Sequence, residues 1–184
     1  MDQTEEREII EAIQGGDIQG YALLVEQYGS AVFNLAFRMT GSRQDADDLA
    51  QETFLRAFTF LSRFDRQRRF FPWLYTIALN LIRKHLKKKR EIPMEPVVAE
   101  PGDDPEQTLT RIQEARWLSL HLDRLPVHLR EAVVLRYYED LPFEEIADIT
   151  GVSTSGAKMR VYRGLERLRV LISEDEGPDG RAEG

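Results

Sequence analysis

The sequence contains no cysteine and no long apolar run, and both absences restrict what the protein can be. Without cysteine the chain forms neither disulfides nor a thiolate metal site. Its histidines, His85, His121 and His128, are scattered without metal-ligand spacing, so we expect no metal and no cofactor. No apolar run approaches the length that crosses a bilayer. The first residues are acidic and lack the features of a secretory signal, so we expect no membrane insertion and a cytoplasmic location.

The net charge of −7 conceals two strongly basic segments. Residues 83–90 read RKHLKKKR and contain no acid. A second basic segment, residues 158–169, is interrupted by one acid, Glu166. Acids are concentrated elsewhere, notably over residues 45–52 and 100–106. Because such segregation creates local fields that the net charge hides, the two basic segments predict two contacts with one polyanion.

Helical periodicity recurs through most of the chain, and no strand-like alternation of comparable strength accompanies it. The expected helices cover residues 5–13, 17–28 continuing at 31–39, 44–61, 72–89, and a compact segment over 109–172. Residues 62–71 are polar, basic and irregular, so we interpret them as a loop, and Pro72 suits the first turn of the next helix. The predicted fold class is all-α.

A proline-rich acidic segment, residues 92–108, separates the two helical parts and shows no periodicity. Such composition predicts a flexible linker. We therefore expect two small helical domains, residues 1–91 and 109–173, followed by a disordered tail over 174–184.

A helix-turn-helix pattern occupies residues 141–163, which read LPFEEIADITGVSTSGAKMRVYR. Gly151 tolerates the positive φ of a tight turn, and Ser153 or Thr154 caps the following basic helix. The N-terminal part of such a helix enters the major groove of DNA. The candidates for duplex contact are Ser153, Thr154, Ser155, Lys158, Arg160 and Arg163. An ordinary αα-hairpin with a solvated basic face is the alternative, and the spacing favours DNA.

A second basic face is predicted on the helix over residues 72–89. Spacing places Trp73, Asn80 and Lys84 on one side, opposite an apolar stripe. An aromatic ring, an amide and several cations suit single-stranded DNA. The candidates are Arg63, Phe71, Trp73, Asn80, Arg83, Lys84 and Lys87. Core packing of the two rings, and a solvated basic helix end, remain open alternatives.

An acidic face is predicted on the helix over residues 44–61, where Asp45, Asp48 and Glu52 share one side and Gln51 lies close by. No histidine and no glycine-rich phosphate loop accompanies these carboxylates, so they do not predict acid–base catalysis or a metal. We expect the protein not to be an enzyme. A solvated face and a protein-binding surface both fit the pattern.

Together these motifs resemble extracytoplasmic-function sigma factors of the sigma-70 family. The resemblance covers residues 21–172 and rests on DADDLAQETF, FPWLYTIALN, the basic helix end, the linker and the terminal helix-turn-helix. It implies a promoter-specificity subunit that binds bacterial core RNA polymerase and promoter DNA and is held by an anti-sigma factor. The implied polymerase-docking residues are Asp45, Asp48, Gln51, Glu52 and Phe54.

The resemblance also implies how promoters are read. Residues 63–87 would recognise and melt the start-proximal (−10) element, and the helix-turn-helix would read the upstream (−35) element as duplex. The recognition helix departs from the family pattern, because Gly156 stands where threonine is usual. A stand-alone helix-turn-helix transcriptional regulator is the alternative function, and it leaves Trp73, Asn80 and the basic helix end unexplained.

Overall fold

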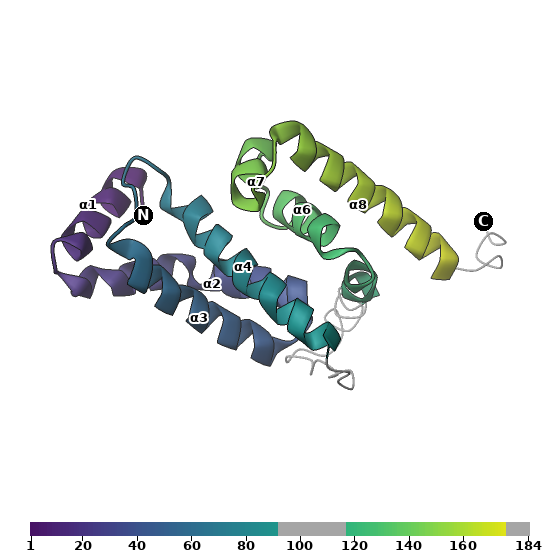
Figure 1. Ribbon diagram of the computed structural model, residues 1–184, viewed down its shortest axis with the longest axis horizontal. Helices are drawn as coiled ribbons and strands as arrows, with labels where there is room; N and C mark the ends of the chain where they lie inside the picture. The colour runs from purple at the N-terminus through teal and green to yellow at the C-terminus, as the bar shows by residue number, and fades with distance from the viewer. Residues whose placement is uncertain (92–116, 176–184) are drawn as a thin grey trace, which may run out of the picture. The chain divides into compact units, whose positions relative to one another are not determined.

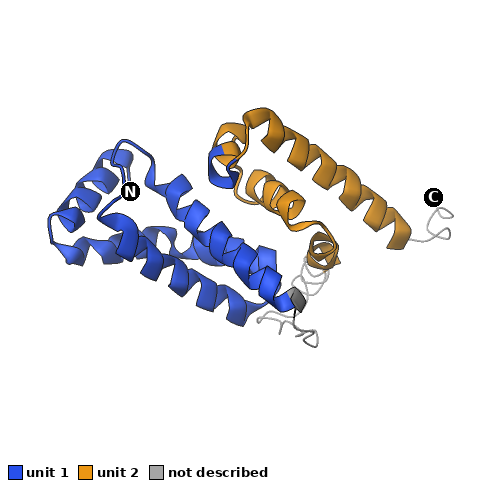
Figure 2. Ribbon diagram, viewed as in Figure 1, with its two compact units in different colours: residues 1–96, 148–151 blue, residues 97–147, 152–184 orange. Residues whose placement is uncertain are grey.

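A computed structural model describes residues 1–91 and 117–175, and within them every regular element is a helix, as predicted (Figure 1). The predicted linker over residues 92–108 lies outside the described residues. The chain divides into two compact units, residues 1–96 with 148–151 and residues 97–147 with 152–184 (Figure 2).

The first unit is built from four α-helices and one 3-10 turn. They are α1 (Gln3–Gln14), η1 (Ile18–Gly20), α2 (Tyr21–Thr40), α3 (Arg43–Leu61) and α4 (Phe70–Glu91). The expected segments 17–28 and 31–39 fall largely within one unbroken helix, α2. Gly29 costs this helix about 1 kcal/mol relative to alanine. Both halves of α2 offset that cost, since Leu24 and Leu35 are each fully buried.

Side-chain and glycine caps fix where these helices begin and end. Asp2 accepts hydrogen bonds from the first turn of α1. Gly41, with φ 68°, ends α2, and the Ser42 hydroxyl then accepts from the backbone N–H of Asp45 to begin α3. Each cap supplies partners for backbone groups that a helix end leaves free.

The loop between α3 and α4 is shorter than predicted, because α4 begins at Phe70 rather than at Pro72. The Phe70 ring is fully buried, so the first turn of α4 is drawn into the core. Pro72 is the third residue of α4, within the turn whose N–H groups lack helical acceptors. The loop therefore covers residues 62–69.

The second unit contains α6 (Val127–Tyr137), the first five residues of α7 (Phe143–Thr150) and α8 (Thr154–Asp175), preceded by helical residues 117–123. The core includes Leu122, Leu125, Val133, Leu168 and Leu171. α8 continues to Asp175, two residues beyond the predicted end of the domain at residue 173.

Candidate functional site

The outer face of α3 presents Asp48 and Gln51 to solvent. Glu52 lies beside them and accepts a hydrogen bond at 2.7 Å from Arg56, one turn further along the helix. Both side chains of that pair are 45% exposed, and such surface pairs contribute about 0–1 kcal/mol. Three of the five predicted docking residues therefore lie together on an accessible surface.

Asp45 does not belong to that outer face, because its carboxylate turns toward α4. Its Oδ2 atom lies 3.0 Å from Lys89 Nζ and 3.3 Å from His85 Nε2, and the side chain is only 23% exposed. Burial raises the pKa of Asp45, but the hydrogen bond from Lys89 and the charge of His85 outweigh it and hold the pKa below its usual value. Asp45 thus joins the start of α3 to the end of α4.

Phe54 is also turned inward and is 7% exposed. Its backbone carbonyl accepts a hydrogen bond at 2.6 Å from Tyr21 of α2. Phe54 therefore supports the spacing of α2 and α3 and offers little surface to a partner.

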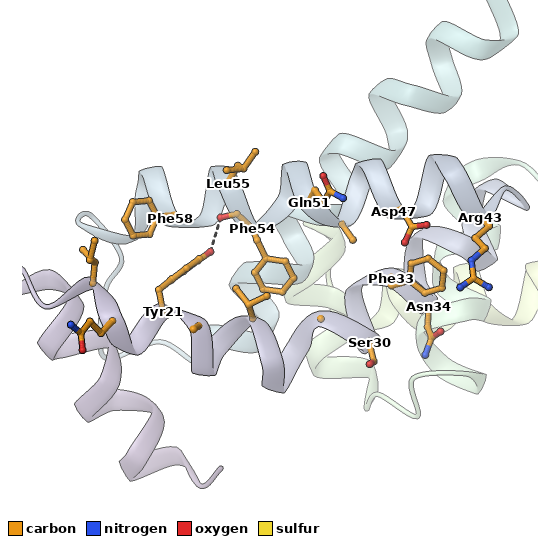
Figure 3. A pocket seen from close by; sticks show the side chains of 16 residues that line it. Tyr21, Ser30, Phe33, Asn34, Arg43, Asp47, Gln51, Phe54, Leu55 and Phe58 are labelled. Atoms are coloured by element: carbon orange, nitrogen blue, oxygen red, sulfur yellow. Dashed lines mark hydrogen bonds between the residues drawn. The ribbon is translucent and has the colours of Figure 1, made fainter.

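A groove of about 1250 Å³ lies between α2 and α3 (Figure 3). Tyr21 and Phe33 line it from α2, and Phe54, Leu55 and Phe58 line it from α3. Leu55 is 65% exposed and Phe58 41% exposed. The groove is thus an accessible apolar surface.

Polar side chains border this groove, with Asp47 and Arg43 toward one end (Figure 3). The groove was not predicted from the sequence, although a signal was present. Gln51, Leu55 and Phe58 continue the face of Asp48 at helical spacing. Following that face beyond Glu52 would have found its apolar half.

The basic face predicted on α4 is exposed at Asn80, Lys84 and Lys87. Arg83 is half-buried, and its guanidinium donates to the Asn80 side-chain oxygen at 3.2 Å. This contact fixes the amide of Asn80 in one orientation. Arg63, the remaining cation of the predicted set, is exposed in the loop before α4.

Trp73 and Phe71 both pack against other rings. The indole of Trp73 lies 4.8 Å from the Phe64 ring, and the ring of Phe71 lies 4.2 Å from that of Tyr75. Both rings therefore take part in the packing at the start of α4. Both side chains are only half-buried, so each ring packs against its neighbours and keeps an exposed part.

The helix-turn-helix has the turn geometry that the sequence predicted. Gly151 has φ +71°, and Ser153 caps α8, because its hydroxyl accepts from the N–H of Gly156 at 3.1 Å. Ser155, Lys158 and Arg163 are exposed on α8. Thr154 and Arg160 are half-buried.

Two further exposed residues of α8 were not predicted. Met159 is 52% exposed and Tyr162 is 62% exposed. They fall four and seven residues after Ser155, on the same side of the helix as Lys158. Lys158 Nζ lies 5.6 Å from the centre of the Phe143 ring of α7, a cation–π distance. The sequence did carry a signal for them, because Met159 and Tyr162 are large side chains at positions of a basic helix that its spacing predicts to be exposed.

Among residues 1–91 and 117–175, no group of three or more potential ligands is arranged to hold a metal ion. No helix in this part of the chain is both long and apolar enough to cross a membrane.

Residues 24–92 match the family described as Sigma-70 region 2, and residues 115–168 match Sigma-70, region 4. The ECF RNA polymerase sigma factor SigW of Bacillus subtilis is 30% identical over 178 residues, covering 90% of this chain and 95% of SigW. These matches disfavour a stand-alone helix-turn-helix regulator.

Solved structures share the fold. CnrH in complex with the cytosolic domain of CnrY has a TM-score of 0.73 and 25% identity, covering 93% of this chain and 99% of that one. The sigma factor RpoE in complex with the anti-sigma factor NepR from Bartonella quintana has a TM-score of 0.68 and 24% identity, covering 83% of this chain and 96% of that one. By sequence and by fold, this chain belongs to the extracytoplasmic-function sigma factors of the sigma-70 family.

Proposed function

We propose that this sigma factor docks on bacterial core RNA polymerase through α3 and the groove beside it, and reads promoter DNA through α4 and α8. The observation that carries the proposal is the contrast between exposed surfaces. α3 is acidic and apolar, whereas α4 and α8 are basic. The polymerase supplies the chemistry, so the sigma factor needs no catalytic residue. It acts in the cytoplasm, where it meets the polymerase.

On α3, Asp48, Gln51 and Glu52 form the polar part of the docking surface, and Leu55 with Phe58 forms its apolar part. An apolar centre with a polar rim is the usual organisation of a protein–protein interface. Asp45 and Phe54 act indirectly, through the positions of α4 and α2. An exposed aromatic such as Phe58 is the kind of residue that contributes most binding energy.

On α4, Asn80, Lys84 and Lys87 contact the non-template strand of the start-proximal element. The two lysines neutralise phosphates, and Asn80 hydrogen-bonds to a base. Arg63 and Arg83 extend this basic surface on either side. Trp73 and Phe71 lie at the start of the same helix, where each ring packs against a neighbour and keeps an exposed part for stacking on a base.

On α8, the exposed face enters the major groove of the upstream element. Ser155 and Lys158 lie within the first five residues of the helix, whose N-terminus itself favours phosphate. Met159 offers an apolar contact of the kind that reads a thymine methyl group. Arg160 and Arg163 contact phosphates, and Ser153 and Thr154 place the start of the helix against the DNA backbone.

An anti-sigma factor is the regulatory partner that fits this surface. CnrH, which has the same fold, was solved with the cytosolic domain of CnrY. A partner that covered the α2–α3 groove would compete directly with the polymerase for Leu55 and Phe58.

Charge reversal on α3 tests the docking surface. Asp48→Arg, combined with Phe58→Ala, is expected to weaken binding to core polymerase by at least about tenfold, because both parts of the interface are lost. Glu8→Arg, which reverses an exposed acid on α1, is the matched control and should bind normally. Undiminished binding by the folded double variant would overturn the docking surface.

A further inference from the structure

α1 precedes the residues that match Sigma-70 region 2, yet its side chains contact the loop between α3 and α4. At the start of the loop, Gln14 Nε2 donates to the carbonyl of Leu61 at 2.8 Å and to that of Phe64 at 3.0 Å. The carbonyl of Leu61 also accepts from the backbone N–H of Phe64 at 3.0 Å, so Gln14 adds a side-chain donor to the turn that ends α3. Gln14 thereby fixes the direction in which the chain leaves α3.

At the other end of the loop, α1 acts through Tyr28. The Tyr28 hydroxyl donates to the carboxylate of Glu6, which is only 8% exposed. The Tyr28 ring lies 5.6 Å from Phe70 and 5.9 Å from Phe71, the first residues of α4. Burial raises the pKa of Tyr28, and the Glu6 hydrogen bond raises it further, so the hydroxyl remains a donor. Glu6 and Gln14 therefore hold the two ends of the loop.

Between these ends, Glu11 of α1 forms an ion pair with Arg66 of the loop. The two side chains are 68% and 50% exposed, so the pair is open to competition from other anions. The same loop carries the exposed cations Arg63, Arg68 and Arg69. Glu11 thus occupies a cation that would otherwise be available to a phosphate.

We propose that α1 positions the 62–69 loop for reading the start-proximal element, with Gln14 as the positioning residue and Glu11 as a competitor of DNA for Arg66. This rests on the proposed function, in which the loop and α4 contact the non-template strand. Gln14 governs base discrimination, whereas Glu11 governs affinity.

Loss of Gln14 and loss of Glu11 are expected to have opposite effects, a poorer discrimination between strands and a higher affinity for DNA. Without the Gln14 donor the loop has more conformations, and a binding surface that must be ordered at the moment of contact discriminates less well. Without the Glu11 carboxylate, Arg66 meets a phosphate without first breaking an ion pair. Each additional phosphate contact on single-stranded DNA steepens the dependence of log affinity on log salt by about 0.7.

The test uses the full-length chain bound to core polymerase and a library of single-stranded oligonucleotides with a randomised block. The enriched strand and a scrambled version are then compared by fluorescence anisotropy. Gln14→Met keeps the side-chain size and removes the donor, and we expect it to narrow the affinity ratio of the two strands by about threefold to tenfold, the range that one or two hydrogen bonds set. An unchanged ratio in a folded variant would overturn the positioning role.

Glu11→Gln is expected to strengthen binding to both strands by about twofold to fivefold, the range of an exposed ion pair. Glu8→Gln removes an exposed carboxylate from the same helix and should have no such effect. In an Arg66→Gln background the gain from Glu11→Gln should disappear. A gain that persists there, or an equal gain in Glu8→Gln, contradicts the competition and indicates a general charge effect.

Failure of the proposed function and failure of the role of α1 give different results. If Arg66→Gln and Lys84→Gln together leave strand binding unchanged, the proposed role of the loop and α4 is wrong. If that pair weakens binding while Gln14→Met and Glu11→Gln do nothing, only the role of α1 is wrong. Thermal unfolding of each variant separates loss of fold from loss of positioning, and Glu11 keeps the proposal testable if Gln14→Met does not fold.

Discussion

Asp45 and Asp48 stand one turn apart on α3 and have different surroundings. Asp48 is exposed, whereas the Asp45 carboxylate lies between Lys89 and His85 of α4. A partly buried pair of this kind contributes more than a surface pair, because fewer water molecules compete for its charges. The two residues therefore affect different properties of the protein.

Asp45→Asn is expected to lower the free energy of unfolding at neutral pH by about 1 kcal/mol, since Lys89 loses a charged acceptor. The pKa of Asp45 is lower in the folded chain than its ordinary 3.8, so its contribution is complete above that value and is lost as the pH falls through the folded-state pKa. Urea unfolding from neutral to acidic pH measures this.

Asp48→Asn is the matched control for that measurement and should unfold like the native chain at every pH. If Asp45→Asn unfolds with the native stability and the native acid dependence, the contact between α3 and α4 does not stabilise the fold.

At the scale of elements, α8 must both pack against α6 and present a face to DNA. Gly164 allows the packing, because a Cβ at this position would lie 2.5 Å from a methyl carbon of Val133 and 3.3 Å from the carbonyl oxygen of Leu129. Gly156 is the third residue of α8, close to its N-terminus. A Cβ at this position would lie 3.2 Å from the Ser153 hydroxyl oxygen.

Gly164→Ala is expected to destabilise the protein by about 1–3 kcal/mol, the usual cost of overpacking. Gly156→Ala on the same helix should change stability much less, because a gain in helix propensity of about 1 kcal/mol offsets its tight contact. Thermal unfolding of both variants tests this. Equal stability of the two variants would mean that α6 moves away from α8 at little cost.

The exposed face of α8 also predicts a functional effect. Tyr162→Ala should weaken binding to upstream-element duplex by about threefold to thirtyfold without changing the slope of affinity against salt, since the ring carries no charge. Lys158→Ala should lower both the affinity and the slope. Electrophoretic mobility shifts of the holoenzyme at several salt concentrations measure the difference, and a changed slope for Tyr162→Ala would contradict its role.

Local patterns in the sequence predicted the elements well. Gly151, Ser153 and the apolar spacing around them are consecutive in the chain, so the helix-turn-helix was predictable from local rules. The start of α4 at Phe70 was not predictable, because it follows from burial of that ring against residues distant in sequence. The contact between Asp45 and Lys89 was not predictable for the same reason, because the two residues are 44 positions apart in the sequence.

The contacts of α1 escaped prediction for a related reason. Gln14 and Leu61 are 47 residues apart, and a glutamine at the end of a short helix carries no sequence signal of what it will meet. The α2–α3 groove also requires two helices to be placed side by side before it exists. Contacts between residues close in sequence were therefore predictable, and those between distant residues were not.

At the scale of the whole molecule, one net-acidic chain carries an acidic surface on α3, proposed to dock on polymerase, and two basic surfaces, proposed to bind DNA. This division explains why the net charge of −7 is compatible with DNA binding. If the proposed surfaces act together, polymerase is directed to DNA that carries both promoter elements.

Run-off transcription by bacterial core polymerase on a library of promoters, with and without this protein, measures whether it directs promoter-specific initiation. We expect protein-dependent initiation at a defined subset that shares a start-proximal and an upstream element, with the Asp48→Arg, Phe58→Ala variant inactive. A folded protein, free of any anti-sigma factor, that stimulates no promoter in the library would contradict the account.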